Sequence, residues 1–222
     1  MNKKLVIWDF DGVIADSEKI YIENRQQLIN KTFGLNWSIQ KTFDHIGGLS
    51  DILNRKILDE LGYITNDSFW KDLLIIDKER MLKGDMKVTP NIEKLMQKLP
   101  KQCIATNSLF ENAFFKLKLI KFWNKYFNKT NVFTGDMVKH YKPEPDLFLL
   151  AAEKMGEKPQ DCIVIEDSIA GLTAAQKAGM ETIAFLGCEI YRDNKHYLEK
   201  IKKMNIKNIC YNIQDIEHIL VR

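Results

Sequence analysis

Two aspartates separated by one residue and followed by a glycine form the most chemically informative stretch of the sequence. The stretch 9–13 (Asp-Phe-Asp-Gly-Val) overlaps a short apolar run, residues 5–10, that predicts a buried strand ending in a tight turn. Parallel strands bring their last residues to the carboxyl edge of a sheet, where ligands bind in open α/β proteins. On an extended chain, Asp9 and Asp11 would share one face. Taken alone, the stretch is equally typical of ordinary turn aspartates before a glycine.

A second pair of acids follows another apolar run. Residues 162–165 lead directly into Glu166, Asp167 and Ser168. Four carboxylates that converge at neighbouring strand ends repel one another unless a hard cation lies among them, and carboxylate oxygens suit Mg²⁺ in particular. The sequence therefore predicts a magnesium site, with Ser168 as the N-cap of a helix over 169–178 that ends at Gly179.

A hydroxyl and an ammonium complete the candidate site. Thr106 ends a third apolar run, and Lys142-Pro143 is expected to open a helix. Both groups suit a phosphate, although Thr106 could instead cap the next helix and Lys142 could be an exposed surface lysine. Each signal is weak alone. Their order along the chain, each at a predicted strand end or helix start, makes the combination specific.

The elements that must position these residues alternate between strand and helix. This alternation predicts a parallel, Rossmann-like, doubly wound sheet, an α/β fold. The predicted strands are residues 5–10, 102–106, 131–134, 162–165 and 181–186, with a further edge strand at 209–213.

A small helical domain is predicted between the first two strands. We place it at residues 17–86, which leaves 1–16 and 87–222 for the main domain. Ser17, Ser50 and Asn66 are expected to be helix N-caps, and the helix from Asp51 to Leu61 is expected to stop at Gly62. The expected core of this insert is aromatic: Phe33, Trp37, Phe43, Phe69 and Trp70.

Composition and charge exclude several classes of protein. The 222 residues are 45% hydrophobic and 28% charged, as in ordinary globular proteins, which excludes disorder, collagen and coiled coil. A net charge of +3 gives no reason to expect nucleic acid or a membrane as partner. The 4 cysteines, at 103, 162, 188 and 210, show no zinc or disulfide spacing. No signal peptide or apolar membrane span is recognised, so a cytoplasmic location is expected.

The chain resembles the haloacid dehalogenase superfamily, in its phosphatase and β-phosphoglucomutase-like branch with a helical cap. Residues 9–13 look like the first family motif, Thr106 the second, Lys142 the third, and Glu166-Asp167 the fourth. The resemblance spans nearly the whole chain. It implies a sheet with strand order 5-4-1-2-3 and an insert that closes over the active site.

The resemblance also implies a mechanism. Asp9 would attack a phosphate ester and become an aspartyl phosphate, and Asp11 would protonate the leaving oxygen and then deprotonate the hydrolytic water. The substrate phosphate would be bound by Thr106, Asn107 and Lys142. Mg²⁺ would be held by the side chains of Asp9 and Asp167, the backbone carbonyl of Asp11, and Glu166, directly or through water.

The substrate is expected to be a small phosphorylated metabolite such as a sugar phosphate or phospho-sugar acid, and the protein a monomer. In the insert, Gly47 and Gly48 are candidates for substrate discrimination, since glycines let backbone approach a ligand closely. They are equally typical of a flexible interhelical turn. His45 is expected to be packed or exposed rather than a metal ligand.

Four alternatives to a phosphatase remain open to different degrees. A dehalogenase is disfavoured because Asp11 is present. A β-phosphoglucomutase-like enzyme is the nearest rival, but that family's cap histidine and arginine are replaced here by Tyr21 and Asp51. A non-catalytic phospho-aspartate switch fits the motif order less well. A degenerate binding protein is disfavoured because every motif position holds a competent residue.

Overall fold

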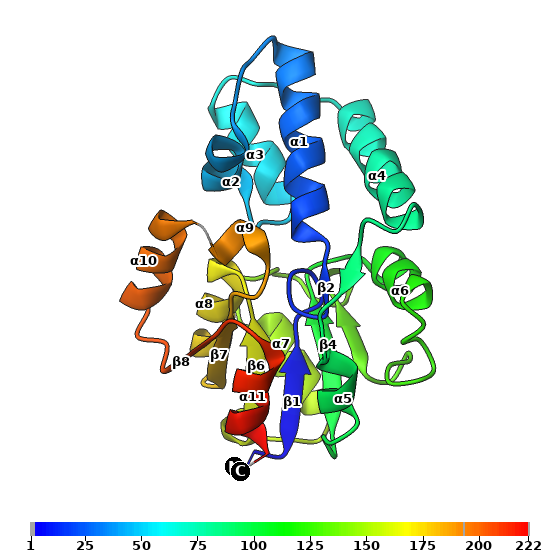
Figure 1. Ribbon diagram of the computed structural model, residues 1–222, viewed down its shortest axis with the longest axis vertical. Helices are drawn as coiled ribbons and strands as arrows, with labels where there is room; N and C mark the ends of the chain where they lie inside the picture. Colours follow the sequence, from blue (N-terminus) through cyan, green and yellow to red (C-terminus); the bar gives the residue numbers. More distant parts are fainter. Residues whose placement is uncertain (1–2, 193, 222) are drawn as a thin grey trace. The chain divides into compact units, whose positions relative to one another are not determined.

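The computed structural model describes residues 3–192 and 194–221 of the chain (Figure 1). The chain forms two compact units. One comprises residues 1–15 and 88–222, and the other comprises Asp16–Lys87. The insert expected at 17–86 falls within the second unit. The two strands β2 (Ala15–Asp16) and β3 (Lys87–Val88) pair where the chain passes from one unit to the other.

The first unit is built on a six-stranded sheet with strand order β5-β4-β1-β6-β7-β8. All of its strand pairs are parallel. The strands are β1 (Leu5–Trp8), β4 (Gln102–Thr106), β5 (Val132–Thr134), β6 (Cys162–Glu166), β7 (Glu181–Phe185) and β8 (Asn208–Cys210). The first five strands of this sheet along the chain are β1, β4, β5, β6 and β7. Numbered 1 to 5 in that sequence, they have the expected order 5-4-1-2-3, which is confirmed, and β8 is added beside β7 at one edge.

The central position of β1 follows from its residues, which are all buried. Leu5 and Ile7 face an apolar cluster formed with neighbouring strands and with helices α7 (Asp146–Lys154) and α8 (Ile169–Lys177). Helices α5 (Ile92–Met96) and α11 (Ile213–Leu220) lie on the opposite face of the sheet (Figure 1). A strand buried on both faces reads as a continuous apolar run, and for this reason the sequence reveals it.

Two predicted strands end two or three residues earlier than the sequence suggests. β1 stops at Trp8, and the chain then turns, with the Gly12 amide donating to the Ala15 carbonyl. The alternation of an extended strand therefore does not reach Asp11. The predicted edge strand at 209–213 is β8, which ends at Cys210, because Asn212 instead caps α11 by accepting from the Asp215 amide.

The remaining helices of this unit are α6 (Phe110–Leu119), α9 (Glu189–Arg192) and α10 (Lys195–Lys203), with short 3-10 turns at Gly135–Met137 and Pro159–Asp161. Ser168 caps α8 as expected, since its Oγ accepts from the Gly171 amide at 2.9 Å. Lys142-Pro143 does not open a helix. α7 begins only at Asp146, after a turn in which the Glu144 amide donates to the Tyr141 carbonyl.

The second unit consists of helices α1 (Glu18–Phe33), α2 (Ile39–Ile46), α3 (Asp51–Glu60) and α4 (Asp67–Leu82). Ser50 and Asn66 cap α3 and α4 as expected. Ser17 precedes α1 in a helical conformation, and its side chain does not cap the helix. The prediction that Ser17 is an N-cap is therefore wrong. The core of this second unit includes Trp37 and Phe69, against which Phe33 and Trp70 pack. Phe43 is also buried.

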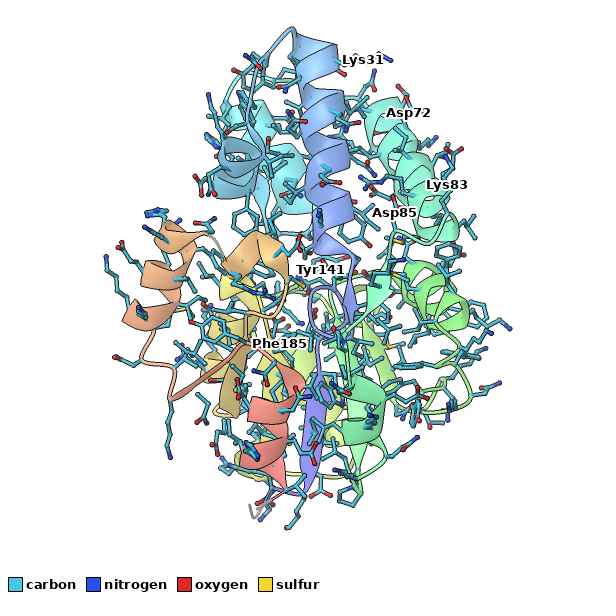
Figure 2. All side chains as sticks on the ribbon, in the orientation of Figure 1. Lys31, Asp72, Lys83, Asp85, Tyr141 and Phe185 are labelled. Carbon is cyan, nitrogen blue, oxygen red and sulfur yellow. The ribbon has the colours of Figure 1, made fainter. Side chains whose placement is uncertain are left out.

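Charged side chains such as Lys31, Asp72 and Lys83 project outward from this unit (Figure 2). Among the described residues, no helix combines the length and the apolar character needed to cross a bilayer.

Candidate active site

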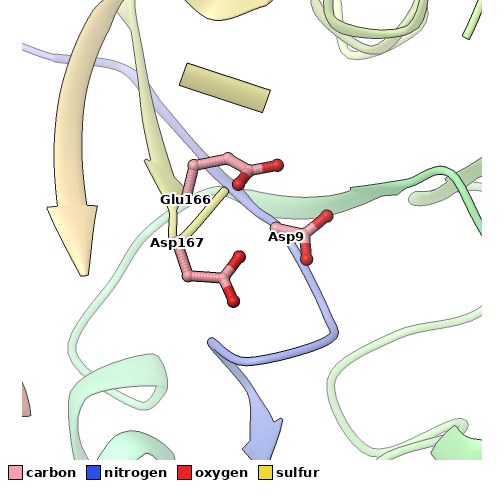
Figure 3. A group of neighbouring side chains, drawn as sticks. All are labelled: Asp9, Glu166 and Asp167. Atoms are coloured by element: carbon pink, nitrogen blue, oxygen red, sulfur yellow. The ribbon is translucent and has the colours of Figure 1, made fainter. Parts of the chain in front are cut away.

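Three buried carboxylates meet at the carboxyl edge of the sheet. One oxygen from each of Asp9, Glu166 and Asp167 lies within 4.8 Å of the others (Figure 3). Asp9 follows β1 directly, whereas Glu166 and Asp167 lie at the end of the adjacent strand β6. The two motifs therefore converge as the strand ends predict. The carboxylate of Asp11 is not part of this group, because the chain has already turned.

Lys142 provides the positive charge within this group. Its Nζ donates to Asp9 Oδ1 at 2.6 Å, to Glu166 Oε1 at 2.8 Å and to the Ala105 carbonyl at 2.7 Å. Lys142 is only 2% exposed. A buried ammonium is tolerated only with such partners, so Lys142 belongs to the site and is not a surface lysine.

Burial and the neighbouring charges have opposite effects on the pKa values of Asp9 and Lys142. Burial raises the pKa of the Asp9 carboxyl above its usual value, the Lys142 ammonium lowers it, and the nearby Glu166 carboxylate adds to the rise. Burial lowers the pKa of Lys142, but Asp9 and Glu166 outweigh it, so that this pKa lies above its usual value. Lys142 therefore keeps its charge at neutral pH.

Glu166 is held in place on both of its oxygens. Besides the contact of Oε1 with Lys142, its Oε2 accepts from the Ser168 amide at 2.8 Å and from Ser168 Oγ at 2.9 Å. A Cβ on Gly171 would lie 1.7 Å from Glu166 Oε1. Only a glycine at this position of α8 leaves room for the carboxylate.

Thr106 and Asn107 come from the end of β4, on the other side of β1. Thr106 is 1% exposed, and its Oγ1 accepts from the Ser108 amide at 3.2 Å rather than capping α6. Asn107 pairs with the backbone of Lys142: its Oδ1 accepts from the Lys142 amide at 3.1 Å, and its Nδ2 donates to the Lys142 carbonyl at 3.4 Å. These bonds position the lysine loop.

A lysine outside all of the sequence motifs holds Asp11. Lys116, on α6, places its Nζ 2.6 Å from both carboxylate oxygens of Asp11 and 3.0 Å from Ser108 Oγ. Ser108 Oγ donates to Asp11 Oδ2 at 3.1 Å. The available signal was a lysine on the apolar face of a predicted helix, three residues after Ala113 and next to Leu117.

Tyr197 is a second residue that the sequence did not reveal. Its hydroxyl donates to the Asp167 carbonyl at 2.8 Å and accepts from the Ile169 amide at 3.0 Å. The tyrosine lies on α10 and is buried. It supports the acidic turn from a helix that no motif marks.

The candidate specificity residues lie in the second unit. Gly47 ends α2, and a Cβ there would lie 2.5 Å from the Phe43 ring, so packing alone requires this glycine. Gly48 has a φ of 67°, which glycine adopts without strain. His45 donates from Nδ1 to the Lys41 carbonyl at 2.8 Å and lies against Trp37, as a packed histidine does.

Comparisons with known proteins agree with this geometry. A family model for haloacid dehalogenase-like hydrolases matches residues 6–185. The chain is 31% identical over 184 residues to a phosphorylated carbohydrates phosphatase of Thermotoga maritima, covering 80% of this chain and 82% of that protein.

Two further comparisons extend this likeness. A mitochondrial (DL)-glycerol-3-phosphatase of Arabidopsis thaliana is 32% identical over 193 residues, covering 80% of this chain and 62% of that longer protein. Among solved structures, a conserved haloacid dehalogenase-like protein from Agrobacterium tumefaciens superposes with a TM-score of 0.83 at 23% identity, covering 99% and 98% of the two chains.

Proposed function

Because the chain belongs to the haloacid dehalogenase-like hydrolases, we propose that it is a magnesium-dependent phosphatase that hydrolyses a small phosphate monoester through an aspartyl phosphate on Asp9. The observation that carries this proposal is the buried pair of Asp9 and Lys142 beside two further carboxylates. A phosphate ester and a carboxylate nucleophile are both negative, and such a site supplies the compensating positive charge.

In the first step, an Asp9 carboxylate oxygen forms a bond to phosphorus while the bond from phosphorus to the leaving oxygen breaks. The electron pair of that bond passes to the leaving oxygen, which takes a proton from Asp11. The alcohol departs, and Asp9 carries the phosphoryl group. Lys142 offsets the charge of Asp9 and Glu166 throughout this step.

In the second step, water attacks phosphorus and gives a proton to Asp11, while the bond between Asp9 and phosphorus breaks. Asp11 regains its proton, Asp9 regains its carboxylate, and inorganic phosphate is released. Thr106 lies at the end of β4, next to β1, where its hydroxyl would hold a phosphate oxygen.

The donor set fits a magnesium ion. Carboxylate oxygens are the ligands that this ion prefers, and three of them converge here in a buried position. Asp9 and Asp167 would bind through side-chain oxygens and Asp11 through its backbone carbonyl. Both oxygens of Glu166 already accept hydrogen bonds, so we propose that Glu166 acts through a bound water. When bound, the ion neutralises charge on the transferring phosphoryl oxygens.

Simple hydrolysis is favoured over phosphoryl transfer between two sugar positions. A mutase must hold a second phosphate, and Asp51 occupies the position expected for its arginine. The guanidinium of Arg25 is ion-paired with Asp51 at 2.5 Å, and the Arg25 side chain is only 7% exposed. It is therefore engaged inside the insert.

We further propose that the insert acts as a cap and that Gly47 and Gly48 contribute to substrate choice there. The relatives named above act on phosphorylated carbohydrates and on glycerol 3-phosphate, which favours a phosphorylated sugar or polyol as substrate. A monomer acting in the cytoplasm completes the proposal.

The test is release of inorganic phosphate from sugar, polyol, nucleotide and amino-acid phosphates, with Mg²⁺ and with a chelator in parallel. We expect magnesium-dependent release from a group of related sugar or polyol esters. Release that is equal with the chelator would contradict the metal site. A folded protein that hydrolyses none of these esters would contradict the proposed activity.

A further inference from the structure

Lys116 is a buried lysine whose contacts surround one carboxylate. It lies on α6, is 1% exposed, and its Nζ is 2.6 Å from each oxygen of Asp11. Its ammonium also lies 4.7 Å from the centre of the Phe10 ring. Burying an ammonium costs several kcal/mol unless it is paired, so this placement is maintained by what it binds.

The arrangement fixes the orientation of the Asp11 carboxylate. A single oxygen contact would leave the group free to rotate, but Lys116 contacts both oxygens and Ser108 donates to Oδ2 at 3.1 Å. Ser108 in turn lies 3.0 Å from Lys116. Each of these three side chains therefore contacts the other two. Ser108 follows the end of β4, Lys116 lies on α6, and Asp11 lies in the loop after β1.

The site thus contains two separate lysine–aspartate pairs. Lys142 pairs with Asp9, and Lys116 pairs with Asp11. We propose that Lys116 is a positioning residue that, with Ser108, orients Asp11 for proton transfer to the leaving oxygen. Between turnovers the two donors hold Asp11 as a carboxylate. The proton that it passes on enters with the substrate, on the monoanion of the phosphate ester, whose second pKa is about 6. This inference rests on the proposed phosphatase function and adds a residue that lies outside the four motifs.

The role predicts a dependence on the leaving group. In the first step the leaving oxygen receives the electron pair of its bond to phosphorus and needs the Asp11 proton only if it is a poor leaving group. An alkoxide such as that from glycerol 3-phosphate needs the proton, whereas 4-nitrophenolate departs without one. Misplacing Asp11 should therefore harm the alkyl ester selectively.

The experiment compares kcat/KM for two esters, with Mg²⁺, in the wild type, K116M and K118M. One is the alkyl phosphate that the wild type hydrolyses best in the panel above, and the other is 4-nitrophenyl phosphate. kcat/KM reports the steps up to the first irreversible transfer. We expect K116M to lose about 10²-fold or more on the alkyl ester and little on the aryl ester. Lys118 lies on the same helix and is exposed, so K118M should match the wild type on both esters.

Two further variants make the test decisive. K116M should cause no additional loss in a D11N background, because residues that act through one another are not additive. S108A should show the same selectivity more weakly, and it serves if K116M does not fold. Equal losses on both esters in a folded K116M, or unselective S108A, would overturn the proposal. A wild type that hydrolyses neither 4-nitrophenyl phosphate nor any ester of the panel above would instead overturn the phosphatase assignment.

Discussion

At the scale of single residues, the site depends on charges that are buried next to each other. Asp9 and Lys142 are 7% and 2% exposed, and each makes the other tolerable in the interior. Substitutions at these positions therefore change both chemistry and stability, and the two effects must be measured separately.

We expect D9N to abolish turnover, by roughly 10³-fold or more, while the fold is retained. An amide of the same size keeps an acceptor for Lys142 but cannot attack phosphorus. Phosphate release and the unfolding midpoint would be measured on the same preparation. Normal release from folded D9N would contradict the role of Asp9.

We expect K142M to lose about 10²-fold or more in kcat/KM, because the charge that compensates the reacting anions is removed. It should also lower the free energy of unfolding by about 3–5 kcal/mol, since Asp9 and Glu166 stay buried without their cation. Denaturant unfolding measures the second effect. A free energy of unfolding equal to that of the wild type in K142M would contradict the buried ion pairs of Lys142 with Asp9 and Glu166.

At the scale of elements, the strand ends were predictable and the supporting helices were not. β1 and β6 are adjacent apolar runs that end in acids, so Asp9, Glu166 and Asp167 could be placed together from the sequence. Lys116 lies 105 residues from its partner Asp11 on a helix without a motif, and Tyr197 lies 28 residues from Ile169. Only the packing of α6 and α10 brings them to the site.

The start of α8 gives a prediction of unusual sign. Glycine to alanine inside a helix normally stabilises by up to about 1 kcal/mol. Here the Cβ of G171A would collide with Glu166, so we expect lower stability and reduced Mg²⁺ binding, seen as a smaller shift of the unfolding midpoint with the ion. A stabilised G171A with normal Mg²⁺ response would refute this packing.

Within the insert, a buried pair links stability to pH. Burial raises the pKa of Asp77 to about 6, and Arg25, 3.7 Å away, opposes this shift. A raised pKa means that the folded state binds the proton more tightly. The contribution of Asp77 to stability is therefore present below its unfolded value of 3.8 and is lost as the pH rises through about 6.

R25M removes the cation that opposes the raised pKa of Asp77. The stability that is lost as Asp77 ionises with rising pH should therefore be larger in R25M than in the wild type. We expect the deficit of R25M relative to the wild type to be greater at pH 8 than at pH 5, measured by denaturant unfolding. The double variant R25M/D77N should show a deficit that hardly depends on pH. A deficit of R25M that is equal at both pH values would contradict the burial of an ionised Asp77.

At the scale of the whole molecule, the sequence predicted the α/β fold and its strand order because each core strand is a short apolar run between helical segments. It was less accurate where the chain turns. Lys142-Pro143 resembled a helix start, and Ser17 resembled a cap, because local propensity carries no information on the tertiary hydrogen bonds formed there.

Metal binding should be visible in the stability of the entire chain. A ligand that binds only the folded state at 100 times its dissociation constant stabilises it by about 2.7 kcal/mol. We expect Mg²⁺ to raise the unfolding midpoint of the wild type and of E153Q, an exposed control on α7, but not that of D167N. An equal shift in D167N would place the ion elsewhere.

Direct detection of a phosphoryl group on Asp9 is the sharpest test of the proposed reaction. The protein would be mixed with its best substrate and Mg²⁺, quenched in acid within a turnover, digested, and analysed by mass spectrometry. We expect an acid-stable, base-labile phosphoryl group on the peptide that contains Asp9 and no such group in D9N. Phosphate release with no such group, or with the group on another residue, would contradict it.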